Sequence, residues 1–344
     1  MPRCLVLFEG RASLGPYGID MLEDFGYELV EVPPAETRLH RKLRDVAEHR
    51  LGVPLDKTLR SAHKVSGVDV VLAFLERQAL AASWLKVHHV PPYSSKPLAM
   101  LACWLADELR TLPADDRRAT ARRYAGVDLT MVWSTNQIDI LADAGFRPDR
   151  VEAISFGFAP GLFPFVDPLE RDSTIAAIGS DRGRDYPTLL RAVGGTDLAM
   201  SLYCRDDNLE GALLPHGVRF LGTVPFEEYR AVLSRVGVVA VPTKVMAYPT
   251  GQTVALEAAA SGVAVVLTDT PAMREYFPED AAMFVAPGDS DGWRTALRSL
   301  RDDDELRTEL GRRGAQHVRS QYTYQAMWRQ VDLLFRSRGW VSGL

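Results

Sequence analysis

The chain has 344 residues, a net charge of −5, and a composition of 47% hydrophobic and 25% charged residues. That length predicts two domains, because single domains typically span about 50–250 residues. The balance of apolar and charged residues is typical of a globular protein with a sizeable core, and the mildly acidic charge does not indicate nucleic-acid binding. No apolar run reaches the roughly 18 residues of a transmembrane helix, so we expect no membrane span.

The number and spacing of the cysteines, with the N-terminal sequence, indicate the cellular compartment of the protein. Cys4, Cys103 and Cys204 are far apart in the sequence and show neither metal-ligand spacing nor a disulfide framework. The N-terminus enters an apolar, strand-like run directly, without the longer apolar segment of a signal peptide. These features predict a protein of the reducing cytoplasm.

Short apolar runs alternate with helical segments in the first half of the chain, which predicts a parallel sheet with intervening helices. The expected strands are residues 4–8, 27–32, 68–74, 128–134 and 151–155, with one more inside 96–104. Ligands bind such sheets at the carboxyl ends of the strands. Glu9, Gly10 and Gly15 follow the first strand in a glycine-rich loop, and Trp104 and Asp107 follow the fourth, so these five are candidate ligand contacts.

The segment Arg38–Lys64 is unusually basic, with eight basic and three acidic side chains. Leu39, Leu43 and Val46 recur at helical spacing, which predicts a basic amphipathic helix. Such a helix suits an anionic ligand or weak peripheral contact with an acidic lipid surface. A solvated helix face is the more common explanation of a charged segment like this one.

Prolines and glycines then interrupt the pattern between Phe156 and Ser173, which is typical of an interdomain linker. We therefore expect an N-terminal domain over residues 1–158, a linker over 159–173 and a second domain over 174–321. Strands are predicted in the second domain at residues 174–178, 199–203, 218–220, 236–241 and 264–267. A helix over Thr253–Ser261 joins the last two, because parallel neighbours need a crossover connection.

The entrance to that helix carries the chemistry. Thr250, Gly251, Gln252 and Thr253 form a small polar turn, and free backbone N–H groups at a helix start, together with the helix dipole, bind anions. Gly251 allows a phosphate to approach the backbone closely. Glu257 lies about one turn further in, where its carboxylate can accept from a hydroxyl pair such as a ribose. A surface helix with a solvated glutamate is an equally good interpretation of this motif alone.

The run Thr250-Gly251-Gln252-x-x-x-x-Glu257-Ala258-x-x-x-Gly262-x-x-Val265-Val266 resembles the nucleotide-sugar site of the retaining glycosyltransferases of family four. The resemblance covers residues 174–325 well and the first half weakly. It implies the α/β GT-B fold, in which two Rossmann-like domains face each other across a cleft. It also implies that Glu257 contacts the nucleotide ribose. A second family glutamate, which contacts the donor sugar, is replaced here by Pro249.

Further roles follow from the same resemblance. Arg182 and Arg184 match the family's basic residues aimed at the donor diphosphate, and Arg184 aligns better with the family's lysine. Thr223 and Val224 match the stretch that packs against the nucleotide base. The first loop, with Glu9, Gly10 and Gly15, faces the acceptor, and Trp104 and Asp107 are further acceptor-side candidates. The final helix, predicted over residues 322–340, packs back on the N-terminal domain.

The implied reaction transfers a sugar from a nucleotide diphosphate sugar, the co-substrate, to a hydroxyl- or amine-bearing acceptor with retention of configuration. Acceptors range from small molecules to glycans and lipid-linked sugars. Gly251, Gln252 and Thr253 with Arg182 and Arg184 would stabilise the departing diphosphate. We expect no metal ion and no other cofactor. A nucleotide-sugar 2-epimerase of similar fold, and a non-catalytic subunit that assists a partner transferase, remain alternatives. The sequence does not predict the oligomeric state.

Overall fold

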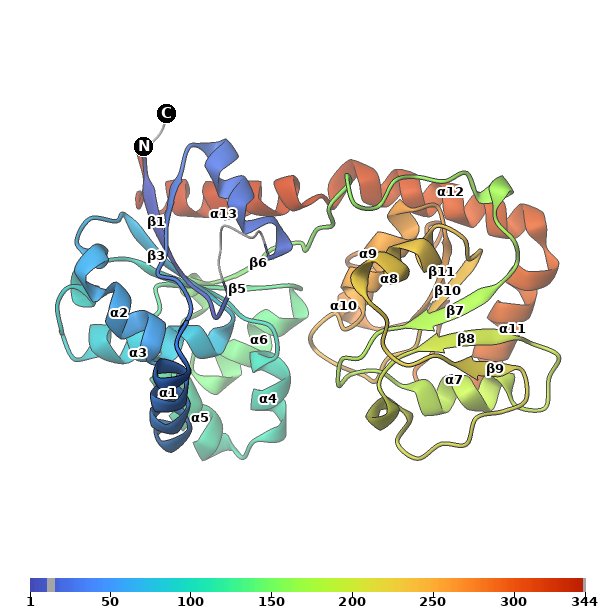
Figure 1. Ribbon diagram of the computed structural model, residues 1–344, viewed down its shortest axis with the longest axis horizontal. Helices are drawn as coiled ribbons and strands as arrows, with labels where there is room; N and C mark the ends of the chain where they lie inside the picture. Colours follow the sequence, from blue (N-terminus) through green and yellow to red (C-terminus); the bar gives the residue numbers. More distant parts are fainter. Residues whose placement is uncertain (11–15, 343–344) are drawn as a thin grey trace. The chain divides into compact units, whose positions relative to one another are not determined.

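The computed structural model describes residues 1–10 and 16–342, and they form two compact units (Figure 1). Unit 1 comprises residues 1–155 and 324–344, and unit 2 comprises residues 156–323. Each unit contains a six-stranded sheet in which every pairing is parallel. The predicted fold class, two doubly wound Rossmann-like domains, is therefore confirmed. Among the described helices, none combines the length and the hydrophobicity that crossing a bilayer requires.

In unit 1 the strand order is β2-β1-β3-β4-β5-β6. The strands are β1 (Arg3–Leu7), β2 (Glu28–Val30), β3 (Val70–Phe74), β4 (Leu98–Leu101), β5 (Leu129–Val132) and β6 (Val151–Ala153). The helices are α1 (Arg38–Leu51), α2 (Asp56–Val65), α3 (Glu76–Val87), α4 (Leu105–Thr111), α5 (Ala114–Arg123), α6 (Asn136–Ala144) and α13 (Tyr324–Ser337). Strands β3, β4 and β5 are buried along their whole length, since parallel sheets are covered on both faces.

In unit 2 the strand order is β12-β11-β10-β7-β8-β9. The strands are β7 (Ile175–Ile178), β8 (Met200–Tyr203), β9 (Val218–Phe220), β10 (Val238–Val241), β11 (Ala264–Thr268) and β12 (Met283–Val285). The helices are α7 (Tyr186–Val193), α8 (Phe226–Leu233), α9 (Gln252–Ala260), α10 (Pro271–Arg274), α11 (Ser290–Asp302) and α12 (Asp304–Gln321). Helices α7 and α11 pack together, as do α9 and α12, and Figure 1 shows the two pairs on opposite faces of the sheet.

The predicted strands and the crossover helix α9 are confirmed to within a few residues, but the expected single helix over residues 38–64 is wrong. It is two helices, because Gly52 ends α1 in the left-handed conformation (φ 64°) and Pro54 follows before α2 begins. Strand β12 has no counterpart among the predictions. It lies at the edge of the sheet, and two of its three residues are only half-buried.

The predicted linker over residues 159–173 belongs to unit 2. Its Arg171 is 7% exposed and donates from Nη1 to the carbonyl oxygens of Leu233 (2.7 Å) and Val236 (2.9 Å). Phe163 packs edge-on against Tyr229 of α8. The segment has no α-helix or strand, but Phe163 and Arg171 anchor it in the core of unit 2.

The C-terminal helix α13 belongs to unit 1. Trp328 is fully buried and donates from Nε1 to the carbonyl oxygen of Tyr17 in the 3-10 helix η2 (Pro16–Phe25) at 2.8 Å. The Tyr27 hydroxyl, just before β2, donates to Asp332 of α13 at 2.8 Å. The aromatic stripe that the sequence shows between residues 322 and 340 is therefore a packing face for unit 1.

Candidate functional site

The strand order of unit 2 directs attention to one place. Successive strands lead away from β7 in one direction up to β9, and the chain then returns to place β10 on the other side of β7. In α/β sheets ligands bind where the loops leave two such strands at their carboxyl ends, and this region between the two loops is called the crevice below. The two loops here are residues 179–185 and 242–251. These are the loops that the sequence singled out.

Backbone contacts fasten these two loops to each other. Arg184 and Thr243 form an isolated antiparallel bridge, and the Lys244 N–H donates to the carbonyl oxygen of Gly183 at 2.8 Å. A β-carbon at Gly183 would lie 2.6 Å from Oγ1 of Thr250, so only glycine permits this approach. The loops are thus held at a defined spacing.

Arg184 lies at the centre of this arrangement. Its side chain is 2% exposed, and its Nε donates to Oδ2 of Asp181 at 2.8 Å. Burial lowers the pKa of Arg184, but Asp181 together with Tyr186 and Tyr229 outweighs it, so the pKa lies above its ordinary value. The guanidinium is therefore a permanent buried cation.

Asp181 organises the loop around Arg184, and sequence reasoning missed it. Its Oδ1 accepts from the Gly183 N–H at 3.0 Å and from the Thr250 hydroxyl at 3.3 Å, while Oδ2 holds Arg184. One carboxylate thereby joins both loops of the crevice. The only sequence signal was an acidic residue directly before Arg182-Gly183-Arg184 in a glycine-rich loop.

Helix α9 begins at the same crevice. Its N-cap is Gly251 at φ 83°, and this residue has no side chain to cap the first N–H groups. A β-carbon at position 251 would lie 2.4 Å from Cγ1 of Val241 and 2.9 Å from Nη1 of Arg184. The helix start therefore lies directly against the buried guanidinium, and two sources of positive potential coincide.

The expectation that the N–H groups of Thr250 and Gln252 are free is wrong. The Thr250 N–H donates to the carbonyl oxygen of Tyr248 at 2.7 Å and the Gln252 N–H to that of Pro249 at 3.0 Å, because the chain makes a tight turn before the helix. The side chain of Gln252 is 1% exposed, and its Nε2 donates to the Tyr248 hydroxyl at 3.0 Å. Pro249 is itself buried and offers no carboxylate at this position.

Two buried polar atoms at the crevice lack protein partners. Within the described part of the chain, Nη1 of Arg184 and Oε1 of Gln252 are shielded from solvent and make no hydrogen bond. Leaving a buried donor or acceptor unsatisfied costs about 1–3 kcal/mol, and more for a charged group. Such groups call for an explanation, and a functional site is one of the common explanations.

Glu257 lies one turn into α9, 6% exposed, where burial raises its pKa to about 7. Its Oε2 accepts a 2.5 Å hydrogen bond from the Tyr229 hydroxyl of α8, which lowers the pKa in part. A carboxylate kept out of water with one hydroxyl partner retains lone pairs for further hydroxyl donors. The solvated surface glutamate considered above is therefore excluded.

The remaining donor-side candidates lie less deeply. Arg182 is exposed, two residues from the buried Arg184. Thr223 is exposed and Val224 half-buried in the loop between the edge strand β9 and α8. Helix α8 directly follows this loop and carries Tyr229, so the segment is linked to α9 through the Tyr229–Glu257 hydrogen bond.

The candidates in unit 1 are more dispersed. Glu9 is exposed and lines a small polar cavity of about 170 Å³, and the Gly10 carbonyl oxygen accepts from Nζ of Lys57 at 2.8 Å. Trp104 and Asp107 begin α4 after β4, a strand that β3 separates from β1 in the sheet. Gly15 lies outside the described residues.

The loop that carries Trp104 is positioned by a residue that sequence reasoning missed. Glu76 starts α3 and is 6% exposed. Its two carboxylate oxygens accept from the backbone N–H groups of Cys103 (2.9 Å) and Trp104 (3.1 Å). The sequence carries no direct signal for this contact, since the partners are 27 and 28 positions apart.

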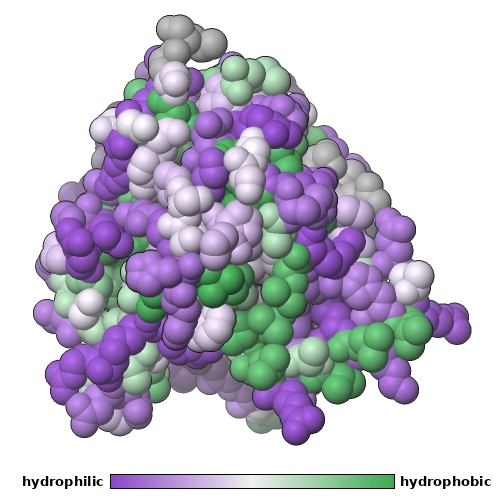
Figure 2. Space-filling view, turned by 90° about the vertical axis from the view of Figure 1, so that its left-hand side faces the viewer, coloured by the Kyte–Doolittle hydropathy of each residue, from purple (hydrophilic) through white to green (hydrophobic). Residues whose placement is uncertain are grey.

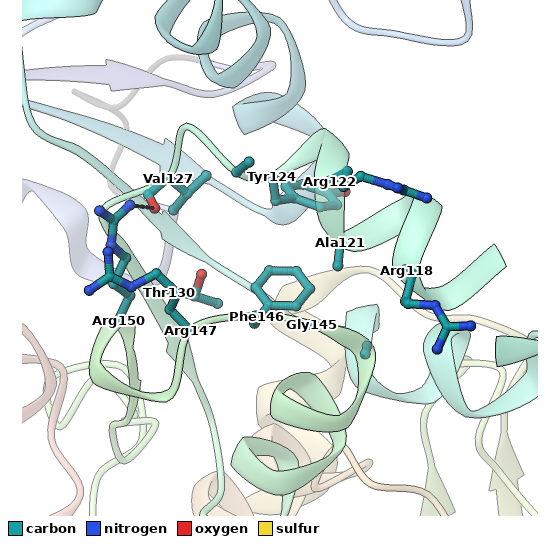
Figure 3. A pocket seen from close by; sticks show the side chains of 12 residues that line it. Arg118, Ala121, Arg122, Tyr124, Val127, Thr130, Gly145, Phe146, Arg147 and Arg150 are labelled. Carbon is teal, nitrogen blue, oxygen red and sulfur yellow. Dashed lines mark hydrogen bonds between the residues drawn. The ribbon is translucent and has the colours of Figure 1, made fainter. Parts of the chain in front are cut away.

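A further cavity of about 330 Å³ lies elsewhere in unit 1 (Figure 3). The side chains of Tyr124 and Phe146 line it together with Arg118, Arg122, Arg147 and Arg150. Arg150 donates to the Val127 carbonyl oxygen at 3.1 Å, and Arg147 is paired with Asp149. The cavity lies at the amino ends of β5 and β6, the edge of the sheet opposite to Glu9 and Trp104, so it is separate from the predicted site.

No three His, Cys, Asp or Glu side chains come together as a potential metal-binding group in residues 1–10 and 16–342. The charged groups that the structure gathers at the crevice are Arg184 and Asp181, with Glu257 further along α9. What this arrangement offers a ligand is a buried cation, a helix start and a carboxylate one turn away.

Comparisons with known proteins point the same way. Residues 180–332, which include all of these unit 2 residues, match the family described as glycosyl transferase-like. No curated protein sequence matches the chain. Among solved structures, HepE of Anabaena, crystallised with UDP and glucose, superposes with a TM-score of 0.71 at 13% identity, covering 98% of this chain and 100% of HepE.

Two other solved structures are similar. Sucrose-phosphate synthase of Thermosynechococcus elongatus gives a TM-score of 0.74 at 16% identity, covering 99% of this chain and 100% of that one. The α,α-trehalose-phosphate synthase of Burkholderia xenovorans gives 0.61 at 14% identity, covering 88% and 79%. The chain thus has the GT-B fold, and its residues 180–332 match the glycosyl transferase-like family.

Proposed function

We propose that the protein transfers a sugar from a nucleotide diphosphate sugar to a hydroxyl- or amine-bearing acceptor, with retention of configuration, as in the family-four enzymes. The observation that carries the proposal is the buried Arg184, whose unpartnered Nη1 lies against the uncapped start of α9. A diphosphate bound at this point would give partners to the unpartnered Nη1 of Arg184 and to the N–H groups of Gly251 and Thr253 together. Complexes of HepE with UDP and UDP-glucose support a nucleotide-sugar donor.

The chemistry follows from the charge that develops during transfer. When the bond between the anomeric carbon and the diphosphate breaks, negative charge grows on the leaving oxygen. A preorganised cation and helix dipole in a dry site stabilise that charge without reorganising. Arg184 would supply the cation, and Gly251 and Thr253 the backbone donors. Arg182, exposed beside Arg184, would add long-range potential.

Glu257 would bind the nucleotide ribose. Its carboxylate lies one helical turn from the proposed diphosphate position. The Tyr229 hydroxyl donates to this carboxylate, which would also accept hydrogen bonds from the two hydroxyl groups of a ribose. Thr223 and Val224 precede the helix that carries Tyr229, which supports the proposal that the base lies against them. Pro249 leaves the contacts of the donor sugar unassigned. The free cysteines support a reducing, cytoplasmic setting.

A binding experiment tests this proposal. The donor is first identified by thermal shift with UDP-, GDP- and dTDP-sugars, and the matching nucleoside diphosphate is then titrated by calorimetry. Glu257→Gln should weaken binding by about 1–3 kcal/mol, the loss expected for charge-assisted hydrogen bonds. Glu227→Gln, an exposed glutamate of α8, is the matched control and should bind as the wild type does.

The outcomes separate the alternatives. Unchanged affinity in folded Glu257→Gln would contradict the ribose assignment. Turnover of the donor without any acceptor to an epimerised nucleotide sugar would indicate a 2-epimerase. Donor binding without turnover under any acceptor condition would favour a non-catalytic subunit.

A further inference from the structure

Helix α1 is amphipathic, but its apolar face points to solvent and its polar face points to the protein. None of its residues is buried, and Leu39, Leu43 and Val46 are 68%, 62% and 61% exposed. Their spacing places them on one stripe of the helix, which in a globular protein normally faces the core. Here that stripe faces solvent.

The polar face of α1 is the one held against the protein. Oε1 of Glu48 accepts from the backbone N–H groups of Leu55 (2.7 Å) and Asp56 (2.9 Å) at the start of α2. Nε2 of His40 lies 2.6 Å from Oδ1 of Asp56. These contacts fix the rotation of α1 about its axis. The stripe of Leu39, Leu43 and Val46, called the leucine stripe below, therefore points to solvent.

More apolar side chains lie exposed at the end of α1 and on α2 and α3. Leu51, Leu59, Trp84 and Val87 are 61%, 59%, 56% and 44% exposed. The first three line a cavity of about 420 Å³ together with Val53, Leu55, Leu80 and Leu85. Figure 2, which views this side of the molecule, shows apolar side chains gathered low on the face among hydrophilic ones. The name apolar surface is used below for Leu39, Leu43, Val46, Leu51, Leu59, Trp84 and Val87.

Positive charge accompanies the apolar surface. Arg38, Lys42 and Arg50 of α1 are exposed, and Arg50 falls on the leucine stripe with Lys42 at its margin by helical spacing. The two acids of the helix do not offset them outward, since Glu48 is turned inward and Asp45 is bonded to Arg44 at 2.6 Å. Basic side chains can extend along an apolar layer and keep their charge at its edge.

We propose that the apolar surface docks the protein on a membrane rich in anionic lipid, with α1 lying in the plane of the interface. An outward apolar stripe bordered by cations is what interfacial helices share. A second copy of the chain fits less well, because a two-fold contact would set this surface against itself and oppose like charges. The proposal is independent of the donor site, since every residue that carries it lies in unit 1.

Vesicle sedimentation tests the proposal on the intact chain. Wild-type protein should sediment with vesicles of equal parts phosphatidylcholine and phosphatidylglycerol, but weakly with phosphatidylcholine alone, and added salt should release it. The triple variant Leu39→Gln, Leu43→Gln, Val46→Gln should lower the partition coefficient by roughly tenfold or more. The matched control replaces exposed leucines elsewhere by glutamine, at Leu169, Leu213 and Leu333, and should bind normally.

The charges give a second, separable effect. Lys42→Gln and Arg50→Gln should each lower partitioning to the anionic vesicles roughly fivefold, with little change on phosphatidylcholine alone. All substituted side chains are exposed, so the melting temperatures of the variants should match that of the wild type.

Three results would overturn the proposal. The first is that the wild-type protein does not sediment with anionic vesicles at low salt. The second is that the α1 triple variant and the wild type bind these vesicles equally. The third is a stable dimer in sedimentation velocity that the triple variant dissociates, because a second copy would then cover the surface.

Discussion

Each of the two units is built on its own parallel sheet, but the loops at the carboxyl ends of the strands are held in place differently in the two units. In unit 2 the loops after β7 and β10 pair through backbone atoms and enclose Arg184, which keeps one buried nitrogen without a partner. In unit 1 the corresponding loops are held by side chains from helices. Lys57 donates to the carbonyl oxygens of Gly10 (2.8 Å) and Val32 (2.5 Å), and Glu76 accepts from two backbone N–H groups after β4.

The difference concerns what each buried charge does. Lys57 and Glu76 are buried with their charges satisfied by backbone groups, which fixes loops. Arg184 is buried with part of its hydrogen-bonding capacity unused, which costs stability until an anion arrives. The two units therefore differ in whether the hydrogen-bonding capacity of these buried charges is used within the protein or left for a ligand.

The largest expected effect comes from removing the buried cation. Arg184→Ala should lower turnover by about 100-fold or more, as the loss of a preorganised charge-stabilising donor does, while affinity for the free nucleoside changes little. Steady-state rates at saturating donor and calorimetry with the nucleoside measure the two effects. Arg182→Ala should have a smaller effect, and Arg205→Ala, an exposed arginine of the same unit, none. Full activity of folded Arg184→Ala would mean that the two units do not differ in this respect.

The next effect is a pH dependence in unit 2. The pKa of Glu257 is about 7 in the folded protein and near 4.5 when unfolded, so the folded state holds its proton more tightly. Its contribution to stability is therefore fully present below about pH 4.5 and is lost as pH rises through 7. Between pH 5 and pH 8 the wild type should lose about 2–3 kcal/mol of unfolding free energy relative to Glu257→Gln.

Urea unfolding of both proteins at the two pH values measures this loss. The comparison with Glu257→Gln cancels the titration of other groups. Parallel pH profiles for the two proteins would show that Glu257 titrates normally and is not held away from water.

The smallest expected effect is a difference in stability between two glycine-to-alanine variants, which separates the cost of steric overlap from the cost of a positive φ. Gly251 and Gly211 both have positive φ, at 83° and 77°, so alanine costs about 1–2 kcal/mol at either position. Only at Gly251 does the new β-carbon meet other atoms, 2.4 Å from Val241, whereas nothing lies within 4 Å at Gly211. Gly251→Ala should therefore be destabilised by about 1–3 kcal/mol more than Gly211→Ala.

Gly251→Ala should also lose nucleoside diphosphate affinity, which Gly211→Ala should keep. Equal unfolding free energies and equal affinities for the two variants would show that the start of α9 can relax away from Arg184. The close approach would then have no functional meaning.

Local patterns in the sequence were sufficient for much of the fold. Most strands of both sheets are short apolar runs that end at polar residues, glycines or prolines. A helix was expected between β10 and β11 because parallel neighbours need a crossover connection. The start of α9 was predictable for the same reason, since Gly251 and the helix formers after it act over a few residues. Arg184 could be ranked above Arg182 only through the family resemblance, which covered this loop.

Contacts between distant segments decided the rest. Asp181 reaches Thr250 across 69 residues, and Tyr229 reaches Glu257 across 28, so neither pair is visible as a local pattern. The same holds for α1, whose spacing predicts an apolar stripe but not the direction in which it points. That direction depends on the hydrogen bonds of Glu48 and His40 to the start of α2. Periodicity reports which residues share a face, and only packing against the rest of the chain determines whether that face meets the core or the solvent.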